Sequence, residues 1–200
     1  MCRLRRDVDP DAAYTACYRA ASAAAEPPAE LVLMATLDKN DRVLTAQNDG
    51  GLAVTSVVVN QHQMRNDKSE LLLLHLSNGA KITVTPDHAL NAHGVLVAAS
   101  EAKVGTALNA AAHGGENALI MRVEKLHGAV INPVTDAGTL LASDAGPPVL
   151  AASHPIWIAP LLLSSPAALL SANAALRVVG DSESIYAIVP TLKRLVSALA

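Results

Sequence analysis

The sequence contains very few aromatic residues. Among its 200 residues there is no phenylalanine, one tryptophan and three tyrosines. A folded core must therefore be built from valine, leucine, isoleucine and alanine, and 51% of the residues are hydrophobic. Nucleic acid is not an expected partner, because its recognition relies on basic stripes and aromatic stacking, whereas this chain has a net charge of −3.

Cysteine and charge are also scarce. Two cysteines, Cys2 and Cys17, are too few for a disulfide framework or a four-ligand zinc site. We therefore expect no metal or cofactor, and either thiol is available as a nucleophile. Only 16% of residues are charged, which excludes intrinsic disorder, and the length fits one sizeable domain with a short appendage.

The composition changes twice along the chain. Residues 9–26 begin with Asp9 and Pro10 and are rich in alanine, which predicts a helix. Short β-branched or leucine-rich runs separated by turn clusters then predict a mainly β domain over roughly residues 17–155. Asn78-Gly79 is the strongest hairpin signal and predicts a type I′ turn, in which both residues have positive φ.

Residues 155–176 contain no charged residue. A bilayer span needs ~20 apolar residues, but prolines at 155, 160 and 166 interrupt the run. We expect a pair of short apolar helices lying on the domain or on a membrane surface. A last, amphipathic helix is predicted over about residues 189–200.

The segment Thr85-Pro86-Asp87-His88 follows a predicted strand. The proline would set a turn that lets Thr85 and His88 face one site. Taken alone, the pattern is more typical of a polar β-turn than of a functional site. Its context is more specific, because Cys17, then Asn40-Asp41-Arg42-Val43-Leu44, then this segment occur in a fixed order.

This ordered set resembles the Hint superfamily, and within it the C-terminal autoprocessing domains of hedgehog-like proteins. That family opens on a catalytic cysteine and continues with a Gly-Asp-Arg-Val-Leu motif; here Asp41 lies 24 residues after Cys17. A later family segment is matched at Gly128, Pro133, Thr135, Gly138 and Thr139. The resemblance implies a Hint fold over residues 17–155, an N-terminal flank of residues 1–16 and a helical apolar tail over residues 156–200.

The resemblance also implies an activity, cysteine-dependent cleavage in cis. Cys17 would attack the carbonyl of Ala16, and an N-to-S acyl shift would convert the peptide bond into a thioester. Water or an alcohol such as a sterol would then resolve the thioester. In this scheme His88 protonates the amide nitrogen, a task suited to an imidazole that titrates near neutrality, and Thr85 orients the same peptide. The partners are the chain's own N-terminal flank and a small nucleophile, which is water, a thiol or a sterol-like alcohol.

Two further positions bear on the second step. His62 stands 23 residues before Thr85, where sterol-transferring hedgehog domains carry an aspartate; it is either a base or a surface histidine on a polar turn. Ser153 stands where hedgehog domains carry a second cysteine. Splicing is not expected, because His154 is followed by Pro155 rather than by the asparagine that ends an intein.

Other interpretations remain open at this stage. Cys17 is followed by Tyr18-Arg19-Ala20 rather than Phe-Pro-Gly, and it fits equally well a small apolar residue on a helix face. The alternative function is an inactive Hint-like structural or interaction module, attached to a membrane through residues 155–176. Residues 1–8 do not form a secretory signal, so only the resemblance suggests a secretory or extracellular route.

Overall fold

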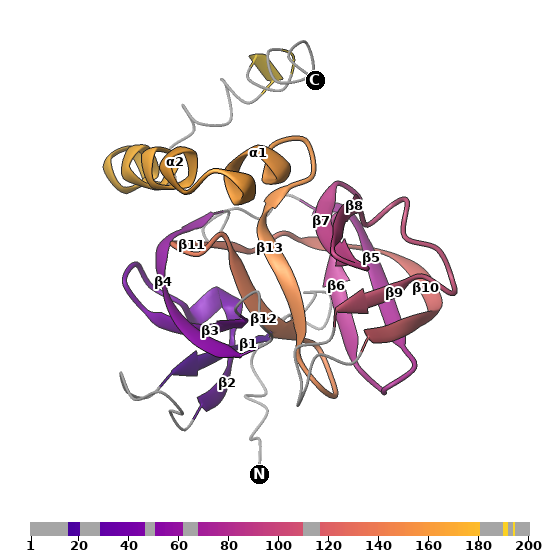
Figure 1. Ribbon diagram of the computed structural model, residues 1–200. Helices are drawn as coiled ribbons and strands as arrows, with labels where there is room; N and C mark the ends of the chain where they lie inside the picture. Colours follow the sequence, from indigo (N-terminus) through magenta and orange to yellow (C-terminus); the bar gives the residue numbers. More distant parts are fainter. Residues whose placement is uncertain are drawn as a thin grey trace.

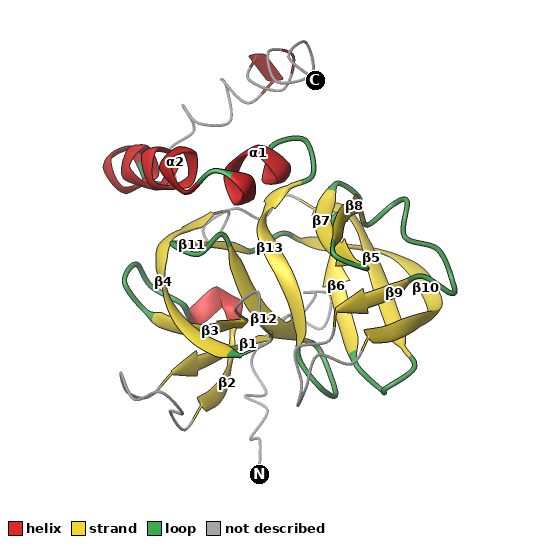
Figure 2. Cartoon of the chain, viewed as in Figure 1, coloured by secondary structure: helices red, strands yellow, loops and turns green. Residues whose placement is uncertain are grey.

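The computed structural model describes residues 16–20, 29–46, 51–61, 68–109, 117–180, 190, 191 and 194. Within these residues, thirteen strands form one hydrogen-bonded sheet that is followed by two α-helices (Figures 1 and 2). The mainly β architecture expected from the sequence is confirmed. The strands are β1 (Ala16–Ala20), β2 (Ala29–Leu33), β3 (Arg42–Ala46), β4 (Leu52–Gln61), β5 (Lys68–Leu76), β6 (Lys81–Val84), β7 (His88–Ala92), β8 (Val95–Ala98), β9 (Ala107–Asn109), β10 (Asn117–Ala129), β11 (Asn132–Thr135), β12 (Thr139–Ser143) and β13 (Val149–Pro155). The helices are α1 (Ala159–Ser164) and α2 (Pro166–Val179).

Strand β13 is the central element of the sheet. The strand order is β11-β4-β3-β1-β12-β13-β7-β9-β10-β5-β6, with β2 paired to β1 and β8 paired to β7. In Figure 1, β13 runs between the two halves of the molecule, and its upper end leads into α1. Any group at the end of β13 therefore lies where both halves and the helices meet.

The N-terminal helix predicted from the alanine-rich composition is wrong for residues 16–20. These residues form β1, in which Cys17 is paired with Val32 of β2 and Ala142 of β12. Helix propensity is a weak preference, and hydrogen bonding to two neighbouring strands overrides it here. Cys17 is buried and belongs to the main hydrophobic core.

The hairpin predicted at Asn78-Gly79 joins β5 to β6, but its turn differs from the prediction. Only Gly79 has a positive φ, of 84°. The Gly79 amide donates to the Leu76 carbonyl at 3.0 Å, and the Leu76 amide donates to the Ala80 carbonyl at 2.9 Å. The Asn78 side chain instead accepts from the Ala80 amide at 3.0 Å. The connection is a type I turn closed by a glycine bulge, a common alternative to the two-residue hairpin.

The motif that begins at Asn40 shapes the turn before β3. Asn40 has a φ of 73°, a left-handed conformation that glycine adopts freely and asparagine tolerates better than most residues. This explains why asparagine can stand where the related motif has glycine. The Asn40 amide donates to the Val57 carbonyl, and the Val57 amide donates to the Asp41 carbonyl, both at 2.8 Å. The turn is thereby fixed to β4.

The two helices predicted after the β domain are present and lie together across the upper end of the sheet in Figure 2. Within the described part of the chain, neither helix is both long and apolar enough to cross a membrane. The helix predicted over residues 189–200 lies almost wholly outside the described residues.

Gly146 provides a test of the packing between the two halves of the sheet. A Cβ at this position would lie 2.5 Å from the Gly79 backbone oxygen, whereas a Cβ on Gly94 would meet nothing within 4 Å. Both glycines have a positive φ, so alanine carries a similar backbone strain at each. We expect Gly146→Ala to lower the free energy of unfolding by about 1–3 kcal/mol more than Gly94→Ala, because a backbone atom cannot move aside. Urea denaturation measures this difference, and equal losses would contradict the described packing.

Candidate functional site

The turn that precedes β7 fixes His88 at the end of β13. The His88 amide donates to the Thr85 carbonyl at 3.0 Å, with Pro86 inside the turn. The Thr85 hydroxyl donates to Asp87 Oδ1 at 2.9 Å, so this side chain is engaged within the turn itself. The Ile156 amide donates to the Asp87 carbonyl at 2.8 Å. The turn is therefore attached to the segment that follows β13.

A register shift between β13 and β7 shapes this end of the sheet. Ala151 pairs with Leu90 and Pro155 pairs with His88, so that four steps along β13 face two steps along β7. Such a bulge redirects side chains, and bulges are frequent beside functional sites. The residues inside the bulge are Ala152, Ser153 and His154, all of which are buried.

The bulge brings His154 close enough to His88 for the two imidazoles to influence each other. Burial lowers the pKa of His88 from 6.5 to about 4, although the Asp87 carboxylate and a hydrogen bond to the Ala152 backbone act in the opposite direction. Burial also lowers the pKa of His154 to about 4, and the proximity of His88 adds to this effect. Each positive charge would disfavour the other, so the pair is neutral at pH 7. An imidazole titrating near neutrality, as expected for His88, is not what this environment produces.

The hydrogen bonds of His88 define where its proton lies. The bond to the Ala152 backbone raises the His88 pKa, so the ring is the donor. Within the described residues, Nε2 of His88 is buried without a hydrogen-bond partner, and so is Nε2 of His154. The neutral His88 ring thus carries its proton on Nδ1 and presents a lone pair on Nε2. A buried polar atom left without a partner costs about 1–3 kcal/mol, so two of them at one place mark a candidate site for a hydrogen-bonding or proton-transferring partner.

Ser153 lies within the bulge, and its hydroxyl is engaged with the turn between β11 and β12. Its Oγ lies 3.1 Å from Thr135 Oγ1 and accepts from the Thr135 amide at 3.3 Å. The Ser153 amide donates to the Gly138 carbonyl at 2.7 Å. These contacts make Ser153 a structural link between the β11–β12 turn and the residue next to it, His154.

Cys17 and His88 lie at different levels of the sheet, measured along the direction of the strands. Cys17 pairs with Ala142, which pairs with Val149 at the beginning of β13, whereas His88 pairs with Pro155 at its end. Because of the bulge, the separation along the strands is two steps on β13, from Val149 to Ala151, and two on β7, from Leu90 to His88. At ~3.3 Å each these correspond to about 13 Å, with three strand spacings of ~4.8 Å between β1 and β7. In Figure 1, β1 lies in the lower half of the molecule and the end of β13 lies at the top. The structure thus brings Thr85, His88 and Ser153 to one end of the sheet and leaves Cys17 at the other.

His62 lies outside the described residues. Gln61, at the end of β4, is linked by the Asn132 side chain to this region, since Asn132 Nδ2 donates to Gln61 Oε1 at 2.9 Å and to the Ser153 carbonyl at 3.2 Å. Within the described part of the chain, no three or more histidine, cysteine, aspartate or glutamate residues are grouped to hold a metal ion.

His154 is the site residue that the sequence analysis did not identify. In the sequence, the proline that follows His154 indicates only that splicing is not expected. The signal that could have found it is a lone histidine in the otherwise uncharged segment from Val149 to Leu176. An ionisable residue inside such an apolar stretch is costly to bury and is often retained for a function.

The histidine pair predicts how stability depends on pH. The unfolded chain binds protons at the usual histidine pKa of 6.5, whereas the folded pair does so only near 4. The folded state is therefore favoured above pH 6.5 and loses this advantage as the pH falls towards 4, by up to about 3 kcal/mol for each imidazole. Urea denaturation between pH 7.5 and 4.5 should show this loss, and the double variant His88→Gln/His154→Gln should reduce it. His93→Asn, at an exposed turn, is the matched control; an identical pH dependence in the double variant and the wild type would contradict the assignment.

Comparisons with known proteins agree on the fold. No protein-family model matches the chain, and no curated protein sequence matches it. Among solved structures, an intein-like domain from Clostridium thermocellum is similar at 21% identity and a TM-score of 0.54, covering 69% of this chain and 94% of that one.

Two inteins give the same result. A DnaB intein from Synechocystis sp. PCC 6803 is 13% identical with a TM-score of 0.54, and the match covers 70% of this chain and 99% of that one. The MchDnaB-1 intein is 18% identical with a TM-score of 0.52, and the match covers 69% of this chain and 97% of that one. At such identities the likeness concerns architecture. The chain has the Hint fold, the β architecture shared by inteins and intein-like domains.

Proposed function

We propose that this chain is an autoprocessing domain that breaks a peptide bond in its own polypeptide, with His88 and His154 as the groups that move protons. The observation that carries this proposal is the meeting of two imidazoles, each neutral at pH 7, at the β13 bulge of a Hint fold: His154 is buried, and His88 is partly buried with its Nε2 enclosed. Peptide cleavage requires that a nucleophile lose a proton and that the leaving nitrogen gain one. A neutral imidazole with an available lone pair can perform both transfers in turn.

In its finer form the proposal places the reaction at Ala16–Cys17. The Cys17 sulfur attacks the Ala16 carbonyl carbon, the C–N bond breaks, and the thiol proton ends on the new amino group. Water or an alcohol, such as a sterol, then attacks the thioester and returns the sulfur to the thiol. The thiol belongs to the residue that follows the carbonyl, so the attack is local, and because Cys17 is buried, the water or alcohol must reach the thioester inside the fold. Because His88 lies at another level of the sheet, its participation requires β1 to leave its pairing with β12.

A second candidate is a Hint-fold module that does not cleave itself and acts through interactions. The position of Cys17 favours it, because this thiol is a core residue of β1, far along the sheet from the histidine pair. The two candidates make opposite predictions for a single experiment on the full chain.

A fusion with a soluble passenger before Met1 distinguishes the two candidates. Incubation with dithiothreitol should release the passenger together with residues 1–16, because a small thiol intercepts a thioester. Mass spectrometry should then find a product that begins at Cys17. Cys17→Ala should abolish release, and His88→Gln or His154→Gln should slow it by about 10²–10⁴-fold if these groups transfer the proton.

The same fusion supplies its controls. Cys2→Ala and His93→Asn should cleave at the wild-type rate. A fusion that stays intact through prolonged incubation refutes self-cleavage and supports the interaction module. Cleavage that persists in Cys17→Ala but is lost in His88→Gln retains the autoprocessing function and refutes Cys17 as its nucleophile.

A contact with a membrane surface through residues 155–176 is compatible with either candidate. Leu161 and Leu170 support it, since these side chains are 51% and 65% exposed on helices that carry no charge before Arg177. The wild-type chain should co-sediment with phosphatidylcholine vesicles, and Leu161→Glu/Leu170→Glu should lose most of this binding, because a charge opposes burial in the interface. Equal recovery of both proteins in the supernatant would refute the contact.

A further inference from the structure

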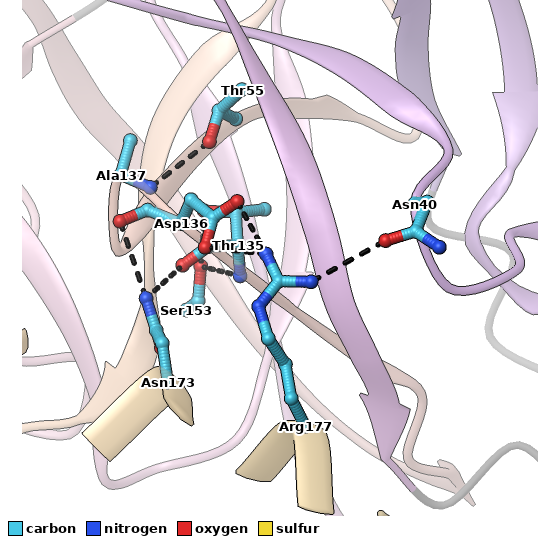
Figure 3. Close-up of polar contacts among 8 residues, drawn as sticks. All are labelled: Asn40, Thr55, Thr135, Asp136, Ala137, Ser153, Asn173 and Arg177. Carbon is cyan, nitrogen blue, oxygen red and sulfur yellow. Dashed lines mark hydrogen bonds and ion pairs between the residues drawn. The ribbon is translucent and has the colours of Figure 1, made fainter. Parts of the chain in front are cut away.

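Helix α2 is attached to the β11–β12 turn by a buried amide. Asn173, which is only 2% exposed, donates from Nδ2 to the Thr135 carbonyl at 3.4 Å and to the Asp136 carbonyl at 3.3 Å. Figure 3 shows this side chain pointing from the helix into the turn. Its Oδ1 is buried and has no partner within the described residues. An unpartnered buried amide oxygen costs free energy, which the two hydrogen bonds from Nδ2 must offset.

One turn further along α2, Arg177 binds the same β11–β12 turn. The Arg177 guanidinium donates to both oxygens of the Asp136 carboxylate, at 2.8 and 2.6 Å. It also donates to Asn40 Oδ1 at 3.3 Å, and the Arg177 carbonyl accepts from Lys39 Nζ at 3.0 Å. One nitrogen, Nη2, makes both contacts to Asp136, and the other, Nη1, makes the contact to Asn40, so the guanidinium is held at two points. The helix is thereby oriented against two turns of the sheet at once (Figure 3).

The turn is also held by the leucines of both helices. A Cβ on Gly138 would lie 2.6 Å from Leu163 Cδ2 and 3.4 Å from Leu169 Cδ1. Glycine, with a φ of 71° here, leaves room for the leucine side chains of both helices to lie against the turn. The turn is thus enclosed by the helices on one side and by the sheet on the other.

On the side that faces away from the helices, the β11–β12 turn contacts β13, the strand that carries His154. The Gly138 carbonyl accepts from the Ser153 amide at 2.7 Å, and the Thr135 hydroxyl lies 3.1 Å from the Ser153 hydroxyl. Ser153 stands between Ala152, whose backbone binds the His88 ring, and His154. An unbroken series of contacts therefore runs from α2 through the turn to both imidazoles.

We propose that α2 is a positioning element of the histidine pair, in which Asn173 and Arg177 hold the β11–β12 turn and thereby Ser153, so that His154 stays buried in the bulge and Nε2 of His88 stays enclosed beside it. Asn173 and Arg177 touch neither imidazole and act through the turn. The consequence for catalysis rests on the proposed function, but the positioning itself does not. Without the contacts of Asn173 and Arg177 to the turn, the β13 bulge would relax and water would reach the histidines.

The test is a titration of the histidine side-chain signals of the full chain by NMR. In the wild type, His88 and His154 should titrate near pH 4. Asn173→Leu removes both donors together with the unpartnered oxygen at nearly constant volume, so the fold should survive. In this variant, and in Arg177→Met, at least one of the two histidines should titrate about one pH unit higher, since hydration favours the charged form. Ser171→Ala is the matched control, because its hydroxyl bonds only to the Ala167 carbonyl of its own helix.

The outcomes separate the two proposals. Unchanged titration of both histidines in Asn173→Leu and Arg177→Met, with far-UV circular dichroism showing folded proteins, overturns the positioning role. If Asn173→Leu fails to fold, Arg177→Met decides alone, because its side chain is partly exposed and its loss leaves the core intact. A shifted titration in a chain that never cleaves its fusion supports positioning while refuting autoprocessing. A cleaving chain with unchanged titration refutes positioning alone.

Discussion

The histidine site depends on one backbone constraint, which is that β13 must satisfy its hydrogen-bonding groups although two of its residues have no counterparts on β7. Buried amides and carbonyls need partners, and here they find them outside the ladder. The Ser153 amide binds the Gly138 carbonyl, the Ser153 carbonyl accepts from Asn132, and the Ala152 backbone is bound by the His88 ring. The site is thus built from backbone amides and carbonyls of β13 that would have bonded to a neighbouring strand if the pairing were regular.

Burial dominates the electrostatics of this site. The Asp87 carboxylate next to His88 favours the charged imidazole, yet the pKa still falls from 6.5 to about 4. Asp87 is exposed, and an exposed carboxylate contributes at most about 1 kcal/mol, whereas a fall of this size corresponds to about 3 kcal/mol. Desolvation therefore outweighs the nearby charge. The result is an imidazole that is neutral at pH 7 and a weaker base than a free histidine, so a proton that it receives from a nucleophile is readily passed on to a leaving nitrogen.

The sequence predicted those parts of the molecule that depend on local chemistry. The strands, the hairpin at Gly79, the turn containing Pro86 and the two helices after the β domain follow from alternation, turn residues and capping. The errors arise where distant contacts decide. Residues 16–20 are strand because β2 and β12 pair with them, and nothing in their own composition records those partners. His154 was overlooked because its meeting with His88 requires a bulge, and a bulge adds residues to a strand without changing their type.

At residue 155, where the sequence predicts a boundary, the composition changes, but the helices that follow are attached to the β domain by specific contacts. The uncharged segment begins there, and the first charge after it is Arg177. That guanidinium binds Asp136 and Asn40, which lie on two different turns of the β domain. Leu176, one residue earlier, packs on Val58, Val59 and Val134. An appendage would need only apolar contacts to cover its buried face, whereas an ion pair, a second guanidinium contact to Asn40 and a buried amide together define one orientation. Residues 159–177 therefore belong to the architecture that holds the bulge, and the unit that positions the histidines extends from β4 to α2.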